Sequence, residues 1–324
     1  MLIKEKLISI VIPVRNEEKH IRKCIESLLS QTYPHYLMEI LFIDGMSEDM
    51  TKQIILERTI NTNLNVRILE NKKRIAPVAM NIGIKNAKGD IIIRLDAHSS
   101  YAKNYIELCV DTLEMTKADN VGGVLTTIGK GIIGQSYANV LSSKFGVGNS
   151  GFRTNAKSDY TDTVPFGAYN KKTFEKFGLY DERLVRNQDY ELNYRIRKNG
   201  GKIYLNSEIR LTYYCRDSIS SIVKQSYENG KWNYITMKLC PGSMGIRHFV
   251  PFIFFTSLIV MPILSFFSIW LAYLFFLELI VYLLLDLLYS KNHNIICAAY
   301  TAIIYPIFHI SYGFGTFRGL INIK

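Results

Sequence analysis

The stretch ISIVIPVRNE, residues 8–17, decides the fold class. Its first seven residues are mostly apolar and predict a buried strand over Ile8–Val14, which ends at the charged and polar residues that follow. Ile21, Ile25 and Leu28 then recur at helical spacing. The alternation continues, with strands predicted over Glu39–Ile43, Val66–Leu69 and Ile91–Leu95, and helices over Pro77–Asn86 and from a capping Ser47 to about Arg58. Strands that alternate with helices make a parallel α/β sheet.

Polar residues stand at the carboxyl ends of three of these strands. Glu17 follows the first strand, Asp44 ends the second, and Asp96 and His98 follow the fourth. Ligands of parallel α/β sheets bind beyond these ends. In outline the set can bind a nucleotide and a divalent metal ion, because an Asp-x-His pair can hold a cation that bridges a diphosphate. The alternative is that each residue only caps a helix or forms a turn.

Composition excludes several other classes of protein. The 324 residues include five cysteines, an odd number without C-x-x-C spacing, so a reducing compartment is expected and neither a disulfide framework nor a zinc site is indicated. The formal net charge is +11, but no zinc-finger or RNA-recognition pattern accompanies it. Lys224, Lys231, Lys238 and Arg247 instead precede an apolar tail. This arrangement indicates contact with anionic membrane lipid and no nucleic-acid partner.

The apolar tail is typical of membrane helices. Phe249–Phe267 and Ile269–Leu288 each fit the length of about 20 apolar residues that crosses a bilayer. A buried soluble helix pair is the alternative, but such helices carry a polar stripe and these are apolar all round. A third stretch, Ile295–Phe317, contains proline, histidine and glycine, so spanning, re-entrant and interfacial positions stay open. Two acidic residues lie in the second stretch: we expect Asp286 to reach the headgroups, and the role of Glu278 stays open.

Charge on either side of the apolar stretches predicts the orientation. The basic residues before Phe249 favour the cytosol, and two crossings return Lys291 to the same side. The apolar run Leu7–Val14 is too short for a signal peptide. We therefore expect a multi-pass membrane protein whose N-terminal domain lies in the cytoplasm. The predicted organisation is a catalytic domain over 1–215, an amphipathic interfacial segment over 216–247, and a membrane domain of two to three helices over 248–324.

A glycine-rich motif occurs at Gly146–Gly151, where the sequence GVGNSG fits the dinucleotide fingerprint. That fingerprint must follow a strand and open a helix. Here a helix-like segment, 136–145, precedes the motif and a polar loop follows it. We interpret it as a flexible loop near the acceptor.

Six groups of residues resemble one enzyme family in order and spacing. They are residues 10–17 (IVIPVRNE), 42–49 (FIDGMSED), 81–90 (NIGIKNAKGD) and 94–98 (RLDAH), followed by 162–169 (DTVPFGAY) and 180–195 (YDERLVRNQDYELNYR). The succession resembles the family 2 inverting glycosyltransferases, and within them the succinoglycan-type exopolysaccharide glucosyltransferases. The resemblance implies a GT-A fold, an α/β nucleotide-diphospho-sugar transferase domain with a mostly parallel sheet, followed here by the C-terminal transmembrane helices.

The resemblance also implies roles for particular residues. The nucleotide sugar would be bound by Pro13, Val14, Glu17, Asp44, Asn81 and Asp96. Asp96 and His98 would hold Mn²⁺ or Mg²⁺, Asp189 would be the catalytic base, and Gln188 and Trp232 would lie on the acceptor side. The chain departs from the family pattern at His98, where a carboxylate is usual, and at Gln188, where glutamate is usual. The Gln-x-x-Arg-Trp motif of processive synthases is absent, which favours addition of a single sugar.

The position of Asp189 supports its assignment independently of the resemblance. It begins a predicted helix with Leu192 and Ile196 on the buried side and Gly200 at the end. A helix N-terminus favours an ionised carboxylate, which can accept a proton from an acceptor hydroxyl. The alternative is that Asp189 is only a helix-start charge.

Together these features predict a membrane-anchored hexosyltransferase of exopolysaccharide or cell-envelope glycan synthesis. It would transfer one sugar from a UDP-sugar to a polyprenyl-diphosphate-linked saccharide. One alternative is a polyprenyl-phosphate glycosyltransferase, whose phosphate acceptor needs no general base. The other is a catalytically silent nucleotide-sugar-binding assembly protein.

Overall fold

The computed structural model describes residues 6–292 and 294–321, and it divides into two compact units. The first, here called the sheet unit, contains the residues up to Thr126 together with Asn155–Tyr213. The second, the helical unit, contains Thr127–Thr154 and the residues from Tyr214 onward. The helical unit is therefore built from two separate segments of the chain.

The predicted parallel strands form one half of the sheet. They are β1 (Ile8–Val14), β2 (Met38–Asp44), β3 (Asn65–Glu70) and β4 (Ile91–Arg94), in the order β3-β2-β1-β4. All of their pairings are parallel, and Val14 lies opposite Asp44 where β1 and β2 end. The four strands predicted from the sequence are confirmed, and their carboxyl ends meet at one edge of the sheet.

The helices between these strands are α1 (Ile21–Leu29), α2 (Thr51–Thr59) and α3 (Ala76–Asn86), and α4 (Tyr105–Thr116) follows β4 and the short strand β5. Gly83 allows α3 to approach the sheet, because a Cβ there would lie 2.2 Å from Cγ1 of Val11. The predicted capping role of Ser47 is wrong, since α2 begins four residues later. Ser47 Oγ instead accepts a hydrogen bond from the backbone N–H of Asn16 at 3.0 Å.

The other half of the sheet is antiparallel, so the sheet is mixed and not mostly parallel. Beyond β4 the order is β8 (Ala168–Asn170), β6 (Asn120–Ile128), β9 (Ile203–Tyr214) and β5 (Ser99–Tyr101), and β7 (Asp159–Tyr160) pairs with β9. The β4–β8, β6–β8, β5–β9 and β7–β9 pairs are all antiparallel. Helices α7 (Lys171–Phe177) and α8 (Gln188–Lys198) follow β8 and complete the sheet unit.

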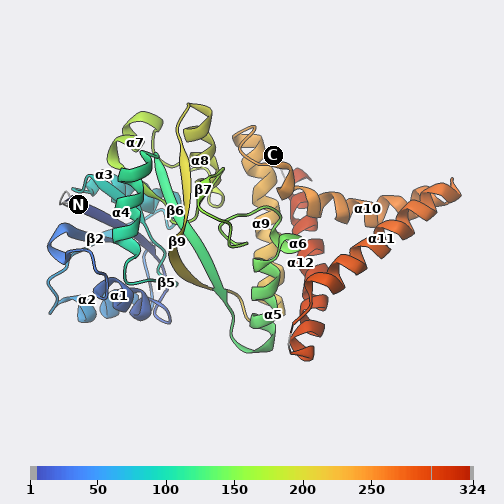
Figure 1. Cartoon of the computed structure of the whole chain (residues 1–324), viewed down its shortest axis with the longest axis horizontal. Coiled ribbons are helices and arrows are strands. Elements are labelled where there is room, and N and C mark those ends of the chain that lie inside the picture. The colour runs from blue at the N-terminus through green and yellow to red at the C-terminus, as the bar shows by residue number, and fades with distance from the viewer. Residues whose placement is uncertain (1–5, 293, 322–324) are drawn as a thin grey trace. The chain divides into compact units, whose positions relative to one another are not determined.

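The helical unit contains α5 (Gly131–Ser142), α6 (Lys144–Val147), α9 (Ile219–Leu239), α10 (Val250–Ser265), α11 (Ile269–Tyr289) and α12 (Ile295–Ile321). Short 3₁₀ turns occur at His35–Leu37 (η1) in the sheet unit and Ile246–His248 (η2) here. Helix α12 packs along α9 and α5 (Figure 1). Small residues make the α9–α12 contact possible, because a Cβ on Gly230 would lie 1.9 Å from the carbonyl oxygen of Tyr312.

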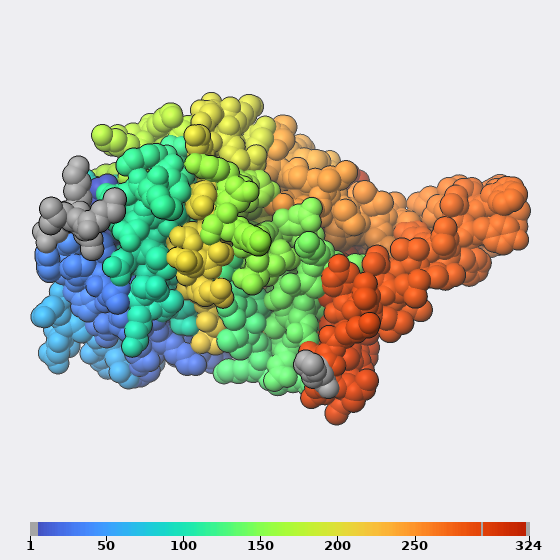
Figure 2. All heavy atoms as spheres, in the orientation of Figure 1, coloured from blue at the N-terminus to red at the C-terminus, as the bar shows by residue number. Residues whose placement is uncertain are grey.

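Two helices, α11 and α12, are long and apolar enough to cross a membrane. Helix α10 has 16 residues, about 24 Å at 1.5 Å per residue, so it is shorter than the predicted stretch Phe249–Phe267, and its span of the membrane stays a prediction. Ile295–Phe317, whose position the sequence left open, lies in the 27-residue α12. The hydrophobic window of α11 is only 6% buried, unlike that of a core helix in a soluble protein. The tip of the α10–α11 hairpin projects beyond the rest of the helical unit and exposes Phe266 and Phe267 (Figure 2).

Residues 127–154, predicted within the first domain, thus pack with the C-terminal helices. The predicted amphipathic segment forms α9, whose buried residues are Ile222, Ser226, Gly230, Asn233 and Thr236. Apart from Ile222, this buried stripe is small and polar. The division into catalytic, interfacial and membrane parts stays a proposal.

Candidate active site

The loops after β1 and β2 are tied together at the edge of the sheet. Asn16 has a left-handed backbone (φ 54°), and its side-chain oxygen accepts the N–H of Glu48 at 2.9 Å. Asp44 is fully buried: both carboxylate oxygens lie 3.2 Å from the N–H of Ser47, and one lies 3.1 Å from Nζ of Lys52. Pro13 and Val14 end β1 beside this carboxylate. These contacts hold the Asp44 carboxylate in place at the edge of the sheet.

His98 connects the loop after β4 to the loop after β1. Its Nδ1 lies 3.3 Å from Oε1 of Glu17, and its Nε2 lies 4.0 Å from Oδ2 of Asp96. Tyr101 holds the backbone at Asp96, because its hydroxyl accepts the Asp96 N–H at 2.7 Å and donates to the Asp96 carbonyl at 3.0 Å. The structure therefore brings together three of the predicted site residues: Glu17, Asp96 and His98.

This set can hold a divalent cation only with help from a ligand. Within 6–292 and 294–321, no three His, Cys, Asp or Glu side chains are arranged as a metal site of their own. A cation that bridges a diphosphate needs only one or two protein ligands, because phosphate oxygens and water supply the others. Asp96 and His98 provide one oxygen and one nitrogen, and Glu17 can orient the ring through its other nitrogen. The residues present therefore fit such a cation.

Arg94 is the site residue that the sequence interpretation missed. It is buried at the end of β4, forms an ion pair with Asp189, and places Nη2 at 3.3 Å from Oδ1 of Asp96. Its guanidinium carbon lies 5.8 Å from the centroid of the Phe166 ring. Burial alone would lower the pKa of Arg94, but the charges of Asp189 and Asp96 outweigh it and raise the pKa, so the group stays charged. In the sequence, Arg94 is a cationic residue at the end of a strand whose other residues are all apolar, and this signal could have revealed it.

Asp189 lies where the sequence predicted it, in the first turn of α8. Asn187 precedes the helix with a left-handed backbone (φ 61°), and Asp189 keeps about a quarter of its side chain exposed. The neighbouring Gln188 is buried, and its side-chain oxygen accepts no hydrogen bond from the described residues. Arg94 Nε likewise donates to none of them. These buried polar atoms beside the carboxylate leave hydrogen-bonding capacity for a substrate.

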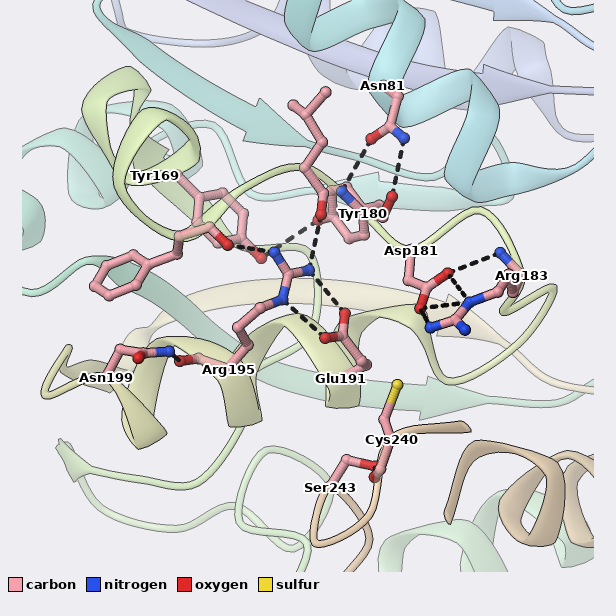
Figure 3. Close-up of polar contacts among 12 residues, drawn as sticks. Asn81, Tyr169, Tyr180, Asp181, Arg183, Glu191, Arg195, Asn199, Cys240 and Ser243 are labelled. Carbon is pink, nitrogen blue, oxygen red and sulfur yellow. Dashed lines mark hydrogen bonds and ion pairs between the residues drawn. The ribbon is translucent and has the colours of Figure 1, made fainter. Parts of the chain in front are cut away.

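A polar network holds the loop that leads to Asp189 (Figure 3). Arg195 forms a bidentate pair with Glu191, with both N–O distances at 2.8 Å, and donates to the carbonyl groups of Phe177 and Leu179. Asn81 of α3 accepts the N–H of Tyr180 at 3.0 Å and donates to its carbonyl at 2.9 Å. These contacts join α3, α7 and α8, so they fix the direction in which α8 begins.

Two predicted site residues, Asn81 and Trp232, are not among the side chains grouped above. The amide of Asn81 is engaged with the 180–182 loop, including Oε1 of Glu182 at 3.1 Å, and so it positions that loop. Trp232 lies on α9 in the helical unit. Contacts of either residue with a substrate stay proposals.

Comparisons with known proteins agree with this geometry. The model of the family described as glycosyl transferase family 2 matches residues 9–177. A dolichyl N-acetyl-alpha-D-glucosaminyl phosphate 3-beta-D-2,3-diacetamido-2,3-dideoxy-beta-D-glucuronosyltransferase of Methanococcus voltae is 32% identical over 97% of each chain. The succinoglycan biosynthesis protein ExoA of Rhizobium meliloti is 31% identical over 75% of this chain and 73% of its own.

A solved structure shares the fold. The mannosyltransferase PcManGT from Pyrobaculum calidifontis, solved with GDP-Man and Mn²⁺, aligns with a TM-score of 0.68 over 98% of this chain and 88% of its own. Its sequence identity is 14%, so the likeness concerns the fold alone. The fold expected from the sequence is thereby confirmed.

Proposed function

Because the chain belongs to glycosyl transferase family 2 and is a glycosyltransferase, we propose that it transfers one sugar, with inversion, from a nucleotide sugar to a lipid-linked saccharide. The observation that carries this proposal is the arrangement around Arg94. This one buried cation contacts Asp96, on the donor side of the proposed reaction, and Asp189, on the acceptor side. The donor and acceptor groups would then meet at a single edge of the sheet.

Asp189 would act as the general base. Its carboxylate accepts the proton of the acceptor hydroxyl while that oxygen forms a bond to the anomeric carbon. The bond from this carbon to the nucleoside diphosphate breaks on the opposite face, so one displacement inverts the configuration. Gln188, buried beside Asp189, would hydrogen-bond the acceptor. Trp232 is proposed as a further acceptor contact.

The donor would be bound by the loops after β1, β2 and β4. Asp44 and Glu17, with Pro13 and Val14, would contact the nucleoside, and we propose UDP as the nucleotide. A divalent cation held by Asp96 and His98 would supply positive charge for the leaving diphosphate when bound. The tightly held Asp44 carboxylate and the Glu17–His98 contact mean that much of this pocket is in place before the donor binds.

The acceptor would be attached to a membrane lipid, as a polyprenyl-diphosphate-linked saccharide. The name of the Methanococcus relative describes an acceptor on dolichyl phosphate, and the ExoA relative is a succinoglycan biosynthesis protein. Two helices of this chain could cross a membrane. Together these observations support a multi-pass protein whose catalytic part faces the cytoplasm and serves exopolysaccharide or cell-surface glycan synthesis.

Membranes containing the full chain test this proposal when they receive labelled nucleotide sugars with Mn²⁺, Mg²⁺ or chelator, followed by analysis of the lipid extract. Asp189→Asn should lower transfer by about 10²–10⁴-fold, because it removes the base, and leave UDP binding intact, because Arg94 keeps Asp96 as a partner on the donor side. Asp159→Asn, an exposed carboxylate of the same unit, is the control. Transfer that survives in Asp189→Asn would indicate a polyprenyl-phosphate acceptor, and UDP binding without any transfer would indicate an assembly protein. Unchanged transfer in chelator would overturn the metal role.

A further inference from the structure

The glycine-rich turn Gly146–Gly151 belongs to the helical unit and follows a helix, so it is not a dinucleotide loop. Ser143 Oγ accepts a hydrogen bond from the backbone N–H of Gly146 at 2.9 Å and so holds the start of the turn. Gly148 then adopts φ 60° and ψ −145°, a conformation almost confined to glycine. The turn is thus a defined structure with a glycine requirement.

Two arginines flank this turn. Nη1 of Arg247 donates to the carbonyl of Asn149 at 3.4 Å, and a Cβ on Gly148 would lie 3.4 Å from the Cβ of Arg247. Arg153 lies at the other end, where its N–H donates to the carbonyl of Ser150 at 2.9 Å. Nη2 of Arg247 and Nη1 of Arg153 are both screened from solvent. Because a guanidinium has five N–H donors, each can keep protein contacts and still donate to an anion.

A buried hydroxyl in this turn points to a ligand. Ser150 is 5% exposed, and its Oγ has no hydrogen-bond partner among the described residues. Native proteins rarely bury a polar side-chain atom without a partner, because its desolvation is then uncompensated. A phosphate oxygen would accept a hydrogen bond from this hydroxyl.

Charge and chain position favour an anion carried by a lipid. Residues 127–154 contain Lys130, Lys144 and Arg153 but no Asp or Glu. Arg247 lies in η2, three residues before α10 begins the apolar hairpin. A cationic turn next to helices of this kind suits a phosphate group at a bilayer surface.

We propose that the turn Gly146–Gly151, with Ser150, Arg153 and Arg247, binds the phosphate of the lipid that carries the acceptor saccharide. This inference rests on the proposed function, because it assumes a lipid-linked acceptor. The two arginines donate to the phosphate oxygens, and the serine hydroxyl completes the contact.

The test uses the full chain in nanodiscs of phosphatidylcholine, with a polyprenyl monophosphate as the probe. Arg247→Gln and Arg153→Gln should each weaken binding by about 10–100-fold, the loss expected for a charged hydrogen bond. Ser150→Ala should weaken it less. Arg22→Gln makes the same substitution at an exposed position of α1, in the sheet unit, and should leave binding unchanged. Arg247→Lys, which keeps the charge, should bind more tightly than Arg247→Gln, and an unchanged Tm shows that the variants are folded.

Competitors identify the source of the phosphate. Phosphatidylglycerol and inorganic phosphate should each compete poorly with the polyprenyl phosphate. Equal competition by phosphatidylglycerol would show a general headgroup site, and equal competition by inorganic phosphate a free-anion site; either result overturns the proposal. Binding that is unchanged in both glutamine variants also overturns it. If lipid binding depends on the arginines but no sugar is transferred, the proposed function fails and the phosphate site stands.

Discussion

Arg94 joins the two carboxylates on which the proposed reaction depends. Removal of its guanidinium leaves Asp96 and Asp189 without their shared partner. We expect Arg94→Met to lower kcat/KM for sugar transfer by about 10–100-fold, the range for lost charged hydrogen bonds. Arg94→Lys should recover only part of the rate, because an ammonium group cannot reproduce the fork of a guanidinium. Wild-type kinetics in Arg94→Met would show that the ion pairs do not position the site.

If His98 is a metal ligand as proposed, it sets which cation the donor site prefers. Imidazole is a suitable ligand for Mn²⁺, whereas Mg²⁺ prefers oxygen ligands. His98→Asp should therefore raise Mg²⁺-supported transfer relative to Mn²⁺-supported transfer. Rates measured over a titration of each metal give the ratio, and His35→Asp, at the distant η1 turn, is the control. An unchanged ratio would exclude His98 as a metal ligand.

The Arg195 network positions two helices, because it fixes the loop between α7 and α8. Arg195→Met leaves Glu191 as a buried charge without its bidentate partner. Breaking such a pair costs about 3 kcal/mol, so thermal unfolding in detergent should show Tm lowered by roughly 5–10 °C. The double variant Glu191→Gln with Arg195→Met should recover part of this loss, since no isolated charge remains buried. A Tm equal to that of the wild type would contradict this account.

Glycines set the distance between α9 and α12. A Cβ on Gly315 would lie 2.0 Å from the carbonyl oxygen of Tyr227, which the backbone cannot accommodate without moving. Gly315→Ala should therefore lower the Tm of the full chain. Gly245→Ala is the matched control, because the nearest atom there is 3.9 Å away. Equal Tm values for the two variants would show that the close helix contact does not contribute to stability.

The strands and helices that could be predicted are those whose own pattern of apolar residues indicates that they are buried. The strand Ile8–Val14 is apolar apart from Ser9, and the structure places it at the predicted residues. The spacing of site residues also carried information, since Glu17, Asp96 and His98 do meet. Arg94 was missed because an isolated cation has no motif, and its meaning depends on Asp189, 95 positions later in the chain. The association of 127–154 with the C-terminal helices depends on long-range packing that no local pattern encodes.

At the scale of the whole molecule, the helical unit is not a C-terminal appendage. The chain enters it at Thr127, returns to the sheet unit at Asn155, and enters it again at Tyr214. The two segments are joined inside this unit by specific contacts, such as the hydrogen bond from Ser136 Oγ to the Cys297 carbonyl at 3.1 Å. Helix α12 therefore completes the packing of helices that precede it by more than 50 residues.

This organisation predicts that truncation after His248 will not release a well-behaved soluble enzyme. The loss of α10–α12 exposes the buried stripe of α9, and on α5 it exposes Tyr137, whose ring centroid lies 6.0 Å from that of Phe308. Newly exposed surface of this kind promotes aggregation. We expect residues 1–248 to elute as aggregates in size-exclusion chromatography. The full chain in detergent, and a full-length Phe266→Ser and Phe267→Ser variant that changes only the hairpin tip, should stay monodisperse. A monodisperse 1–248 fragment that binds UDP would show that α12 is dispensable for folding.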